Sequence, residues 1–174
     1  MPSIQASDGV RLDYTEHGTP NGRPVVLLAG FKAPATSWAW QLSALENYRV
    51  FAVDLRGHGT SEHPEAGASM QRRGEDVRDV LENLGVSDVI LIGGSLGGNT
   101  IWSYIDQFGS DRVRAAIIVD QTPKMMNTAH WSHGYYGYDE SNAETPTSPR
   151  GSPPPVRAPP CCCAGCVWLG CCAH

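Results

Sequence analysis

Ser95 is the residue of this 174-residue chain whose neighbours best fit a chemical role. It stands in a G-x-S-x-G frame with Gly93 and Gly97, directly after the uninterrupted apolar run 89–92. Such a run predicts a strand that is buried on both faces. Four apolar residues then follow at helical spacing: Leu96, Ile101, Ile105 and Phe108. A serine between a strand and a helix stands clear of the sheet, so this context predicts a nucleophile elbow.

The turn at Ser95 needs small neighbours, because its backbone conformation is strained and residues two before and two after it approach closely. The N–H of Leu96 would lie at the start of the helix, where a developing oxyanion is stabilised. The alternative is a glycine-rich turn of another α/β protein that holds a phosphate. The strand and helix around the motif favour the nucleophile.

The elements that must position this turn can be read from apolar runs and turn residues. Ser7-Asp8-Gly9 between two alternating runs predicts a hairpin. Buried strands are expected over residues 24–30, 50–54 and 113–120. Helices are indicated by Trp38, Leu42 and Leu45, and by Met70, Val77, Leu81 and Leu84 with Gly85 at the end. A hairpin followed by alternating strands and helices predicts an α/β fold with a mostly parallel, doubly wound sheet.

Three motifs in this order resemble the α/β-hydrolase superfamily. They are Leu27-Leu28-Ala29-Gly30-Phe31 with a later Trp38, Asp54-Leu55-Arg56-Gly57-His58-Gly59-Thr60-Ser61, and Gly93-Gly94-Ser95-Leu96-Gly97-Gly98. The resemblance is closest to its branch of small esterases, perhydrolases and cofactor-free haloperoxidases, and it covers about residues 1–138. It implies the α/β-hydrolase fold and no cofactor.

The resemblance also implies roles for individual residues. Ser95 matches the nucleophile, and Leu96 and Phe31 match the residues whose backbone N–H groups form the oxyanion hole. This chain has Ala29-Gly30 where the superfamily often has His-Gly, but the donor is a backbone group in either case. Gly94 stands where a larger residue is common, which leaves room beside Ser95. A serine at the elbow argues against dehalogenases and epoxide hydrolases that attack with a carboxylate.

Three other polar residues are weaker candidates. Asp120, at the end of the strand over 113–120, could be the acid of a catalytic triad or an aspartate that caps a turn. His58 matches a loop residue and not the base. Asp54 is expected to brace that loop as a hydrogen-bond acceptor.

The character of the chain changes near residue 139. We expect a truncated α/β-hydrolase domain over 1–138, with the possible start of a lid at 125–138, and a disordered Pro/Cys-rich tail over 139–174. The aromatic residues of the expected lid are Trp131, Tyr135, Tyr136 and Tyr138. Residues 146–160 hold seven of the 13 prolines, and all six cysteines lie between Cys161 and Cys172. Proline at this density does not continue a helix or a strand.

Three consequences follow from this tail. The last strands of the usual sheet and the histidine base would be missing, and the strand over 113–120 would have an unpaired outer edge. The late histidines are His130, His133 and His174. The tail indicates either translation in a shifted reading frame or, less favoured, a zinc site around Cys163-Ala164-Gly165-Cys166. We expect no metal site.

The net charge and the N-terminal sequence bear on the partners and the location of the protein. A net charge of −5 gives no reason to expect nucleic acid or an anionic membrane as partner. The N-terminus lacks the basic and apolar regions of a signal peptide, and no segment is long enough to span a membrane. We therefore expect a cytoplasmic serine hydrolase acting on a small-molecule acyl substrate, such as an ester or a lactone, or in perhydrolysis of a carboxylic acid. The alternatives are a non-catalytic remnant and a module that binds metal or a partner through its cysteines.

Overall fold

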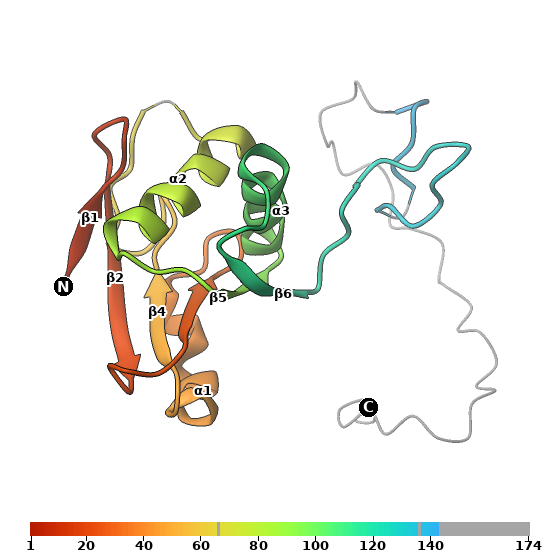
Figure 1. Ribbon diagram of the computed structural model, residues 1–174. Helices are drawn as coiled ribbons and strands as arrows, with labels where there is room; N and C mark the ends of the chain where they lie inside the picture. Colours follow the sequence, from red (N-terminus) through yellow and green to blue (C-terminus); the bar gives the residue numbers. More distant parts are fainter. Residues whose placement is uncertain (66, 136, 143–174) are drawn as a thin grey trace, which may run out of the picture.

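A six-stranded sheet forms the centre of the computed structural model, which describes residues 1–65, 67–135 and 137–142 (Figure 1). Its strands are β1 (Ser3–Gln5), β2 (Arg11–Gly18), β3 (Pro24–Leu28), β4 (Arg49–Val53), β5 (Val89–Gly94) and β6 (Val113–Val119). The spatial order is β1-β2-β4-β3-β5-β6. Strands β4, β3, β5 and β6 are parallel, and β2 joins β4 antiparallel. The prediction of a mostly parallel sheet with an N-terminal hairpin is confirmed.

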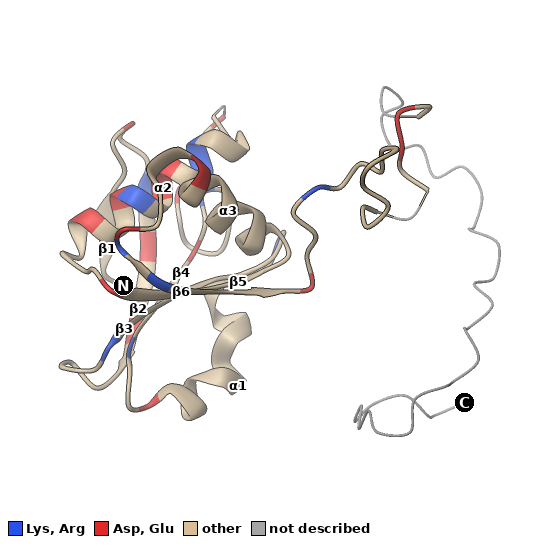
Figure 2. Cartoon of the chain, turned by 45° about the vertical axis from the view of Figure 1, so that its right-hand side comes forward, with Lys and Arg blue, Asp and Glu red and all other residues tan. Residues whose placement is uncertain are grey.

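The helices cover the two faces of the sheet unequally (Figure 2). One face carries the long helices α2 (Met70–Asn83) and α3 (Leu96–Phe108). The other carries three short turns, η1 (Ala35–Trp38), α1 (Ala39–Leu42) and η2 (Ser43–Leu45), where the sequence predicted one short helix.

The apolar core is divided by the sheet into two clusters. The larger cluster lies under α2 and α3 and includes the fully buried Phe51, Leu81 and Ile101. The smaller one lies under the short turns and includes Val25 and Leu27. The two clusters together hold β3 and β4 buried on both faces, so the carboxyl end of β3 is rigidly placed beside the end of β5.

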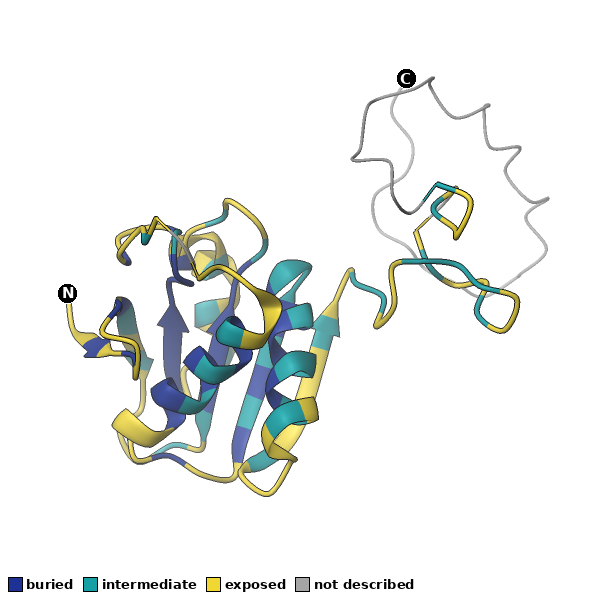
Figure 3. Cartoon of the chain, turned by 90° about the horizontal axis from the view of Figure 1, so that it is seen from above, coloured by how far each residue is buried: buried dark blue, intermediate teal, exposed yellow. Residues whose placement is uncertain are grey.

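Two elements differ from the expectation of strands buried on both faces. Ile90 and Ile92 of β5 are only partly buried, because the short turns cover little of that face. Five of the seven residues of β6 are exposed, including Ile117 and Val119 (Figure 3). The prediction of a buried strand over 113–120 is therefore wrong for its packing, although the strand itself forms. The cause is that no further element of the described chain packs beside β6.

The hairpin is bound to the rest of the fold through charged groups at its turn. Gly9 has φ +88°, as a tight turn requires. The Ser7 N–H and hydroxyl both donate to the Asp79 carboxylate of α2, at 2.8 and 2.9 Å. The buried Arg56 donates to both carboxylate oxygens of Asp76, each at 2.6 Å, and to Asp8 at 3.0 Å. These bonds connect the hairpin turn, α2 and the loop after β4.

Residues 120–142 leave the sheet beyond β6 as turns with two isolated bridges, and the described residues among them, 120–135 and 137–142, form no helix or strand. The expected lid over 125–138 falls here and stays a prediction. The predictions made for the tail concern residues that, from 143 onward, lie outside the described part of the chain. None of the helices in the described ranges is both long enough and apolar enough to cross a membrane.

Candidate functional site

Ser95 lies at the junction of β5 and α3 in a backbone conformation that serine rarely adopts. Its φ and ψ are +46° and −111°. A non-glycine residue in such a region costs on the order of 1–3 kcal/mol and persists only where the surrounding structure enforces it. The predicted turn between strand and helix is therefore present at Ser95, and the turn is strained.

The close packing of two backbone segments explains the glycines on either side of Ser95. A Cβ on Gly97 would lie 2.2 Å from the carbonyl oxygen of Leu28 in β3, and one on Gly93 would lie 2.5 Å from the carbonyl carbon of Gly97. Both contacts are with backbone atoms, which cannot move aside. A Cβ on Gly94 would lie 3.8 Å from the Trp38 ring, an ordinary contact. The motif thus needs glycine at positions 93 and 97, whereas position 94 has spare room.

Two backbone N–H groups, in segments that meet at Ser95, have no hydrogen-bond acceptor among the described residues. Leu96 is the first residue of α3, so its N–H has no acceptor within the helix. Phe31 follows Gly30, whose added Cβ would lie 3.5 Å from the Ser95 Cβ. Among the described residues neither N–H donates a hydrogen bond. The two groups predicted to form an oxyanion hole therefore come from segments that meet at Ser95.

A hydrogen bond to Asp54 holds the loop that contains Phe31 in place. One Asp54 carboxylate oxygen accepts from the Ala35 N–H at 2.6 Å, and the other accepts from the Thr60 N–H at 2.9 Å. Asp54 is buried and therefore holds the loop after β3 against the loop after β4. Its predicted role as a brace is confirmed. No local pattern in the sequence indicates that Ala35 would be one of its partners.

His58 is buried beside the same loop. Its Nδ1 lies 2.9 Å from the Arg56 carbonyl oxygen, and its ring meets that of Phe31 edge to face at 6.0 Å between centroids. Since a carbonyl only accepts, Nδ1 carries the proton. Nε2 is buried and has no hydrogen-bond partner in the described structure. Phe31 itself is 69% exposed. The buried His58 ring therefore packs against the inner side of Phe31, and the outer side of Phe31 faces solvent.

Asp120 follows directly on β6, beside the elbow. The N–H of Ser95 donates to the carbonyl oxygen of Val119 at 2.9 Å, which brings the residue after Val119 to this end of the sheet. Asp120 has φ +53° and is exposed. Its carboxylate makes no hydrogen bond to a histidine in the described ranges, so the structure brings this candidate acid to the site without pairing it.

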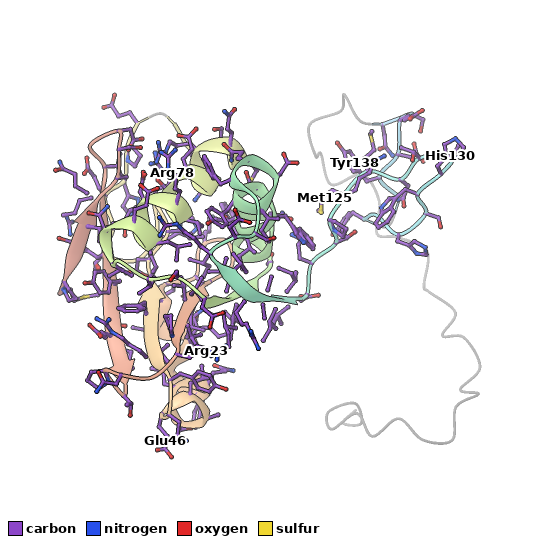
Figure 4. All side chains as sticks on the ribbon, in the orientation of Figure 1. Arg23, Glu46, Arg78, Met125, His130 and Tyr138 are labelled. Atoms are coloured by element: carbon purple, nitrogen blue, oxygen red, sulfur yellow. The ribbon has the colours of Figure 1, made fainter. Side chains whose placement is uncertain are left out.

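The remaining histidines of the described chain do not complete a triad. None of His17, His58, His63, His130 and His133 is hydrogen-bonded to the Ser95 hydroxyl. Figure 4 shows His130 with Met125 and Tyr138 on the segment that extends away from the sheet. Within the ranges that the structure describes, no group of three or more potential ligands is placed to hold a metal ion.

Trp38 is the neighbour of the site that the sequence analysis did not assign to it. The indole lies over Gly94, and its Nε1 is buried without a hydrogen-bond partner among the described residues. The sequence analysis named Trp38 as part of the first motif and as an apolar position of a short helix, but gave it no role at the site. The absence of a side chain at Gly94 is the signal that could have located it, because the space left there has to be filled by a neighbour.

Comparisons with known proteins agree with this geometry. The family model described as alpha/beta hydrolase fold matches residues 23–151. A non-heme haloperoxidase of Rhodococcus erythropolis is 35% identical over 128 residues, which are 72% of this chain and 46% of that protein. A bifunctional esterase/perhydrolase of Acinetobacter calcoaceticus is 32% identical over 129 residues, with 72% and 46% covered.

A comparison with solved structures indicates the same fold. An esterase from Exiguobacterium antarcticum superposes with a TM-score of 0.70 and 30% identity, over 76% of this chain and 50% of that one. The chain thus spans about half the length of the relatives that it matches. By sequence, by strand order and by the turn at Ser95, this chain belongs to the family of proteins with the alpha/beta hydrolase fold.

Proposed function

We propose that this chain acts as a serine hydrolase in which Ser95 attacks the carbonyl carbon of an acyl substrate. The substrate class is an ester or a lactone, or a carboxylic acid that is converted with hydrogen peroxide to a peracid. The names of the relatives, an esterase and an esterase/perhydrolase among them, support this class of reaction.

The observation that carries the proposal is the strained conformation of Ser95 between β5 and α3. Strain of this kind persists where the surrounding structure imposes it, and it gathers at functional sites. Two further features support it. The glycines at 93 and 97 allow β3 and α3 to pack directly against the turn, and the N–H groups of Leu96 and Phe31 have no acceptor in the described structure.

In the proposed reaction, the Ser95 oxygen forms a bond to the carbonyl carbon, and the carbonyl oxygen becomes an oxyanion. The N–H groups of Leu96 and Phe31 then donate to that oxyanion. Collapse of the intermediate breaks the bond to the leaving oxygen and leaves an acyl group on Ser95, which water or hydrogen peroxide then removes. The leaving oxygen departs as the alcohol of an ester, stays on the acyl chain as the hydroxyl of an opened lactone, or departs as water from a carboxylic acid. In the first half the Ser95 proton passes through a general base to the leaving oxygen.

A histidine base is the group that the described residues do not supply at hydrogen-bond distance from Ser95. A site with an oxyanion hole and binding alone retains roughly 10³–10⁴-fold acceleration over water. We therefore propose that the chain reacts with activated acyl and phosphonyl compounds but turns over ordinary esters slowly. Asp120, which ends β6 beside the elbow, is the candidate acid for such a base.

A fluorophosphonate probe tests the nucleophile directly, because its adduct needs attack by the serine oxygen and stabilisation of the phosphonyl oxygen by the proposed oxyanion hole, but no turnover. We expect mass spectrometry to find the adduct on the peptide that contains Ser95, and Ser95→Ala to abolish it. Ser87→Ala serves as the matched control, since Ser87 is an exposed serine in the turn before β5. Circular dichroism of each variant checks the fold.

Two results would contradict the proposal. Labelling of the folded wild-type chain no faster than that of free serine would mean that this copy of the fold is non-catalytic. Equal labelling of the wild type and the Ser95→Ala variant would place the reactive group elsewhere.

A further inference from the structure

Two consecutive glycines, Gly93 and Gly94, end β5 directly before the strained Ser95. Glycine loses more conformational freedom on folding than any other residue, and it brings no side chain that packing could hold. A strained conformation persists only where the surrounding structure enforces it. The position of Ser95 therefore depends on groups outside β5 that hold these two glycines in place.

The two glycines are held from opposite faces of the sheet, because successive residues of a strand point to opposite faces. A Cβ on Gly93 would lie 2.5 Å from the carbonyl carbon of Gly97, so this glycine packs against the start of α3. A Cβ on Gly94 would lie 3.8 and 3.9 Å from Cζ2 and Cη2 of Trp38. Trp38 thus lies over Gly94 on the face that carries η1 and α1, opposite α2 and α3 (Figure 2).

The turn that carries Trp38 is anchored on the sheet. Ala35, the first residue of η1, is buried, and its N–H donates to the buried Asp54 carboxylate at 2.6 Å. Trp38 ends η1 and packs against the smaller apolar cluster of the core. Its Nε1 is buried without a hydrogen-bond partner among the described residues. Because burying an indole N–H without a partner is unfavourable, packing and not hydrogen bonding holds the indole over Gly94.

The hydrogen bonds of the sheet do not replace the contact between Trp38 and Gly94. The pairing of β5 with β3 ends at Gly93, whereas Gly94 pairs with Val119 of β6. Among the described strands Gly94 is therefore paired on one side only, and strand pairing acts within the plane of the sheet. The contact with Trp38 acts across that plane, where Gly94 has no side chain of its own.

We propose that Trp38 is a positioning residue for Ser95. Its indole takes the place of the side chain that residue 94 lacks, and together with α3 it fixes the end of β5 so that the Ser95 oxygen is held in one orientation. The inference rests on the proposed role of Ser95 as the nucleophile. A misplacement of about 1 Å in a reacting group can cost about 10²-fold in rate, so this contact affects reactivity without touching the substrate.

A size exchange between positions 38 and 94 tests the contact in the full chain. Trp38→Leu leaves a gap over Gly94, and Gly94→Leu places an isobutyl group against the indole. Each variant alone should lower the rate of fluorophosphonate labelling at least about tenfold. The double variant fills the gap from position 94 and should recover most of the wild-type rate, which is specific to a direct contact. Trp40→Leu is the matched control, since Trp40 is 87% exposed, and it should be labelled at the wild-type rate.

The length of the acyl chain separates a positioning residue from a wall of the substrate pocket. A positioning residue acts on Ser95, so Trp38→Leu should slow acylation by p-nitrophenyl acetate and by p-nitrophenyl octanoate by the same factor. Trp38→Phe removes less volume and should slow both by a smaller factor. Faster acylation by the octanoate alone would mean that Trp38 limits the space for the substrate, and it would overturn the proposal.

Amide hydrogen exchange provides a measurement that does not depend on reactivity. The Ser95 N–H donates to the Val119 carbonyl at 2.9 Å. It should exchange faster in Trp38→Leu than in the wild type, and it should be protected again in the double variant. This result in a wild type that is not labelled would support the role of Trp38 and contradict the proposed function.

Three results would overturn the role of Trp38. They are labelling of a folded Trp38→Leu variant at the wild-type rate, additive losses in the double variant, and an equal loss in Trp40→Leu. Circular dichroism of each variant checks the fold. If Trp38→Leu does not fold, the same comparisons are made with Trp38→Phe, alone and combined with Gly94→Ala.

Discussion

The N–H of Ser95 and the carbonyl of Val119 are joined by a hydrogen bond of 2.9 Å, which ties the strained turn to the outermost strand. Ser95 is therefore held from three sides, by β5 before it, by α3 after it and by β6 beside it. Gly97 at the start of α3 packs directly against the backbone of Leu28 in β3. The position of the Ser95 side chain therefore depends on the central strands more than on any loop.

The first prediction concerns this contact of Gly97 with β3. Gly97→Ala would bring a Cβ to 2.2 Å from the Leu28 carbonyl oxygen, so α3 must shift. Overpacking of this kind costs typically about 1–3 kcal/mol, which outweighs the helical preference of alanine. We expect a lower free energy of unfolding in urea and loss of fluorophosphonate labelling.

Gly94→Ala is the matched control for that variant, since its Cβ would only reach ordinary contact with Trp38 at 3.8 Å. We expect a stability close to that of the wild type. If both alanine variants were equally stable, the close approach of β3 to α3 would not be what requires glycine in the motif.

The second prediction separates the backbone of Leu96 from its side chain. Leu96→Pro removes the N–H that we propose for the oxyanion hole, whereas Leu96→Ala keeps it. Loss of one oxyanion donor costs about 10²–10³ in rate. Labelling by the probe should fall by that order in the proline variant and by much less in the alanine variant.

Circular dichroism must accompany this comparison, because a residue before proline is restricted and Ser95 already has an unusual conformation. A folded Leu96→Pro variant that is labelled as fast as Leu96→Ala would remove Leu96 from the proposed oxyanion hole.

The third prediction concerns the buried ion pair of Arg56 and Asp76. Arg56 is 1% exposed and donates two hydrogen bonds of 2.6 Å to Asp76. Removing one partner of a buried pair leaves an uncompensated charge and costs about 3–5 kcal/mol. We expect Arg56→Met to lose stability of that order. Arg56→Met combined with Asp76→Leu should be more stable than Arg56→Met alone, because Arg56→Met leaves the buried Asp76 carboxylate with Arg72 as its only ion-pair partner among the described residues, at 3.1 Å, and the second substitution removes that carboxylate.

Urea unfolding of both single variants and the double variant measures the coupling. Additive losses would indicate that Asp8 and the Gly67 carbonyl, which also accept from Arg56, carry the stability instead of the pair.

The parts of the fold that could be predicted from the sequence are those set by neighbouring residues. The hairpin turn at Gly9, the apolar strand of β5 and the helix after Ser95 each follow from periodicity and turn residues within about a dozen positions. The order of motifs added the prediction that Leu96 and Phe31 serve Ser95 together, and the structure places Gly30, the neighbour of Phe31, against Ser95.

The parts that could not be predicted depend on contacts between distant segments. Ser7 and Asp79 are 72 positions apart, and Ala35 and Asp54 are 19 apart, so no local pattern indicates that they meet. The apolar run of β6 alone predicted a buried strand, because such a run looks the same whether or not another strand packs beside it. The unpaired outer edge was expected only from the absence of further strand–helix alternation after residue 139. Trp38 was not assigned to the site because its indole packs over Gly94, a residue that is distant from it in the sequence.

The last prediction concerns stability in acid and rests on Asp79. Burial favours the protonated carboxyl, but the hydrogen bonds from Ser7 and the charge and hydrogen bond of Arg72 outweigh it and hold the pKa of Asp79 below its ordinary value. A carboxyl whose pKa is lower in the folded state stabilises the fold at pH values above the unfolded pKa of about 3.9. That contribution is lost as the pH falls through the lower, folded value.

Asp79→Asn should therefore destabilise the chain near neutral pH, by about 1–3 kcal/mol for the lost charged hydrogen bonds. Below about pH 4 the difference from the wild type should shrink, since the wild type then loses the same interaction. Urea unfolding at a series of pH values measures both. Glu46→Gln removes an exposed carboxyl that makes no ion pair in the described structure and should leave the pH dependence unchanged. If the difference between Asp79→Asn and the wild type were constant from pH 7 to pH 2, the ionised carboxylate would not be what holds the hairpin turn to α2.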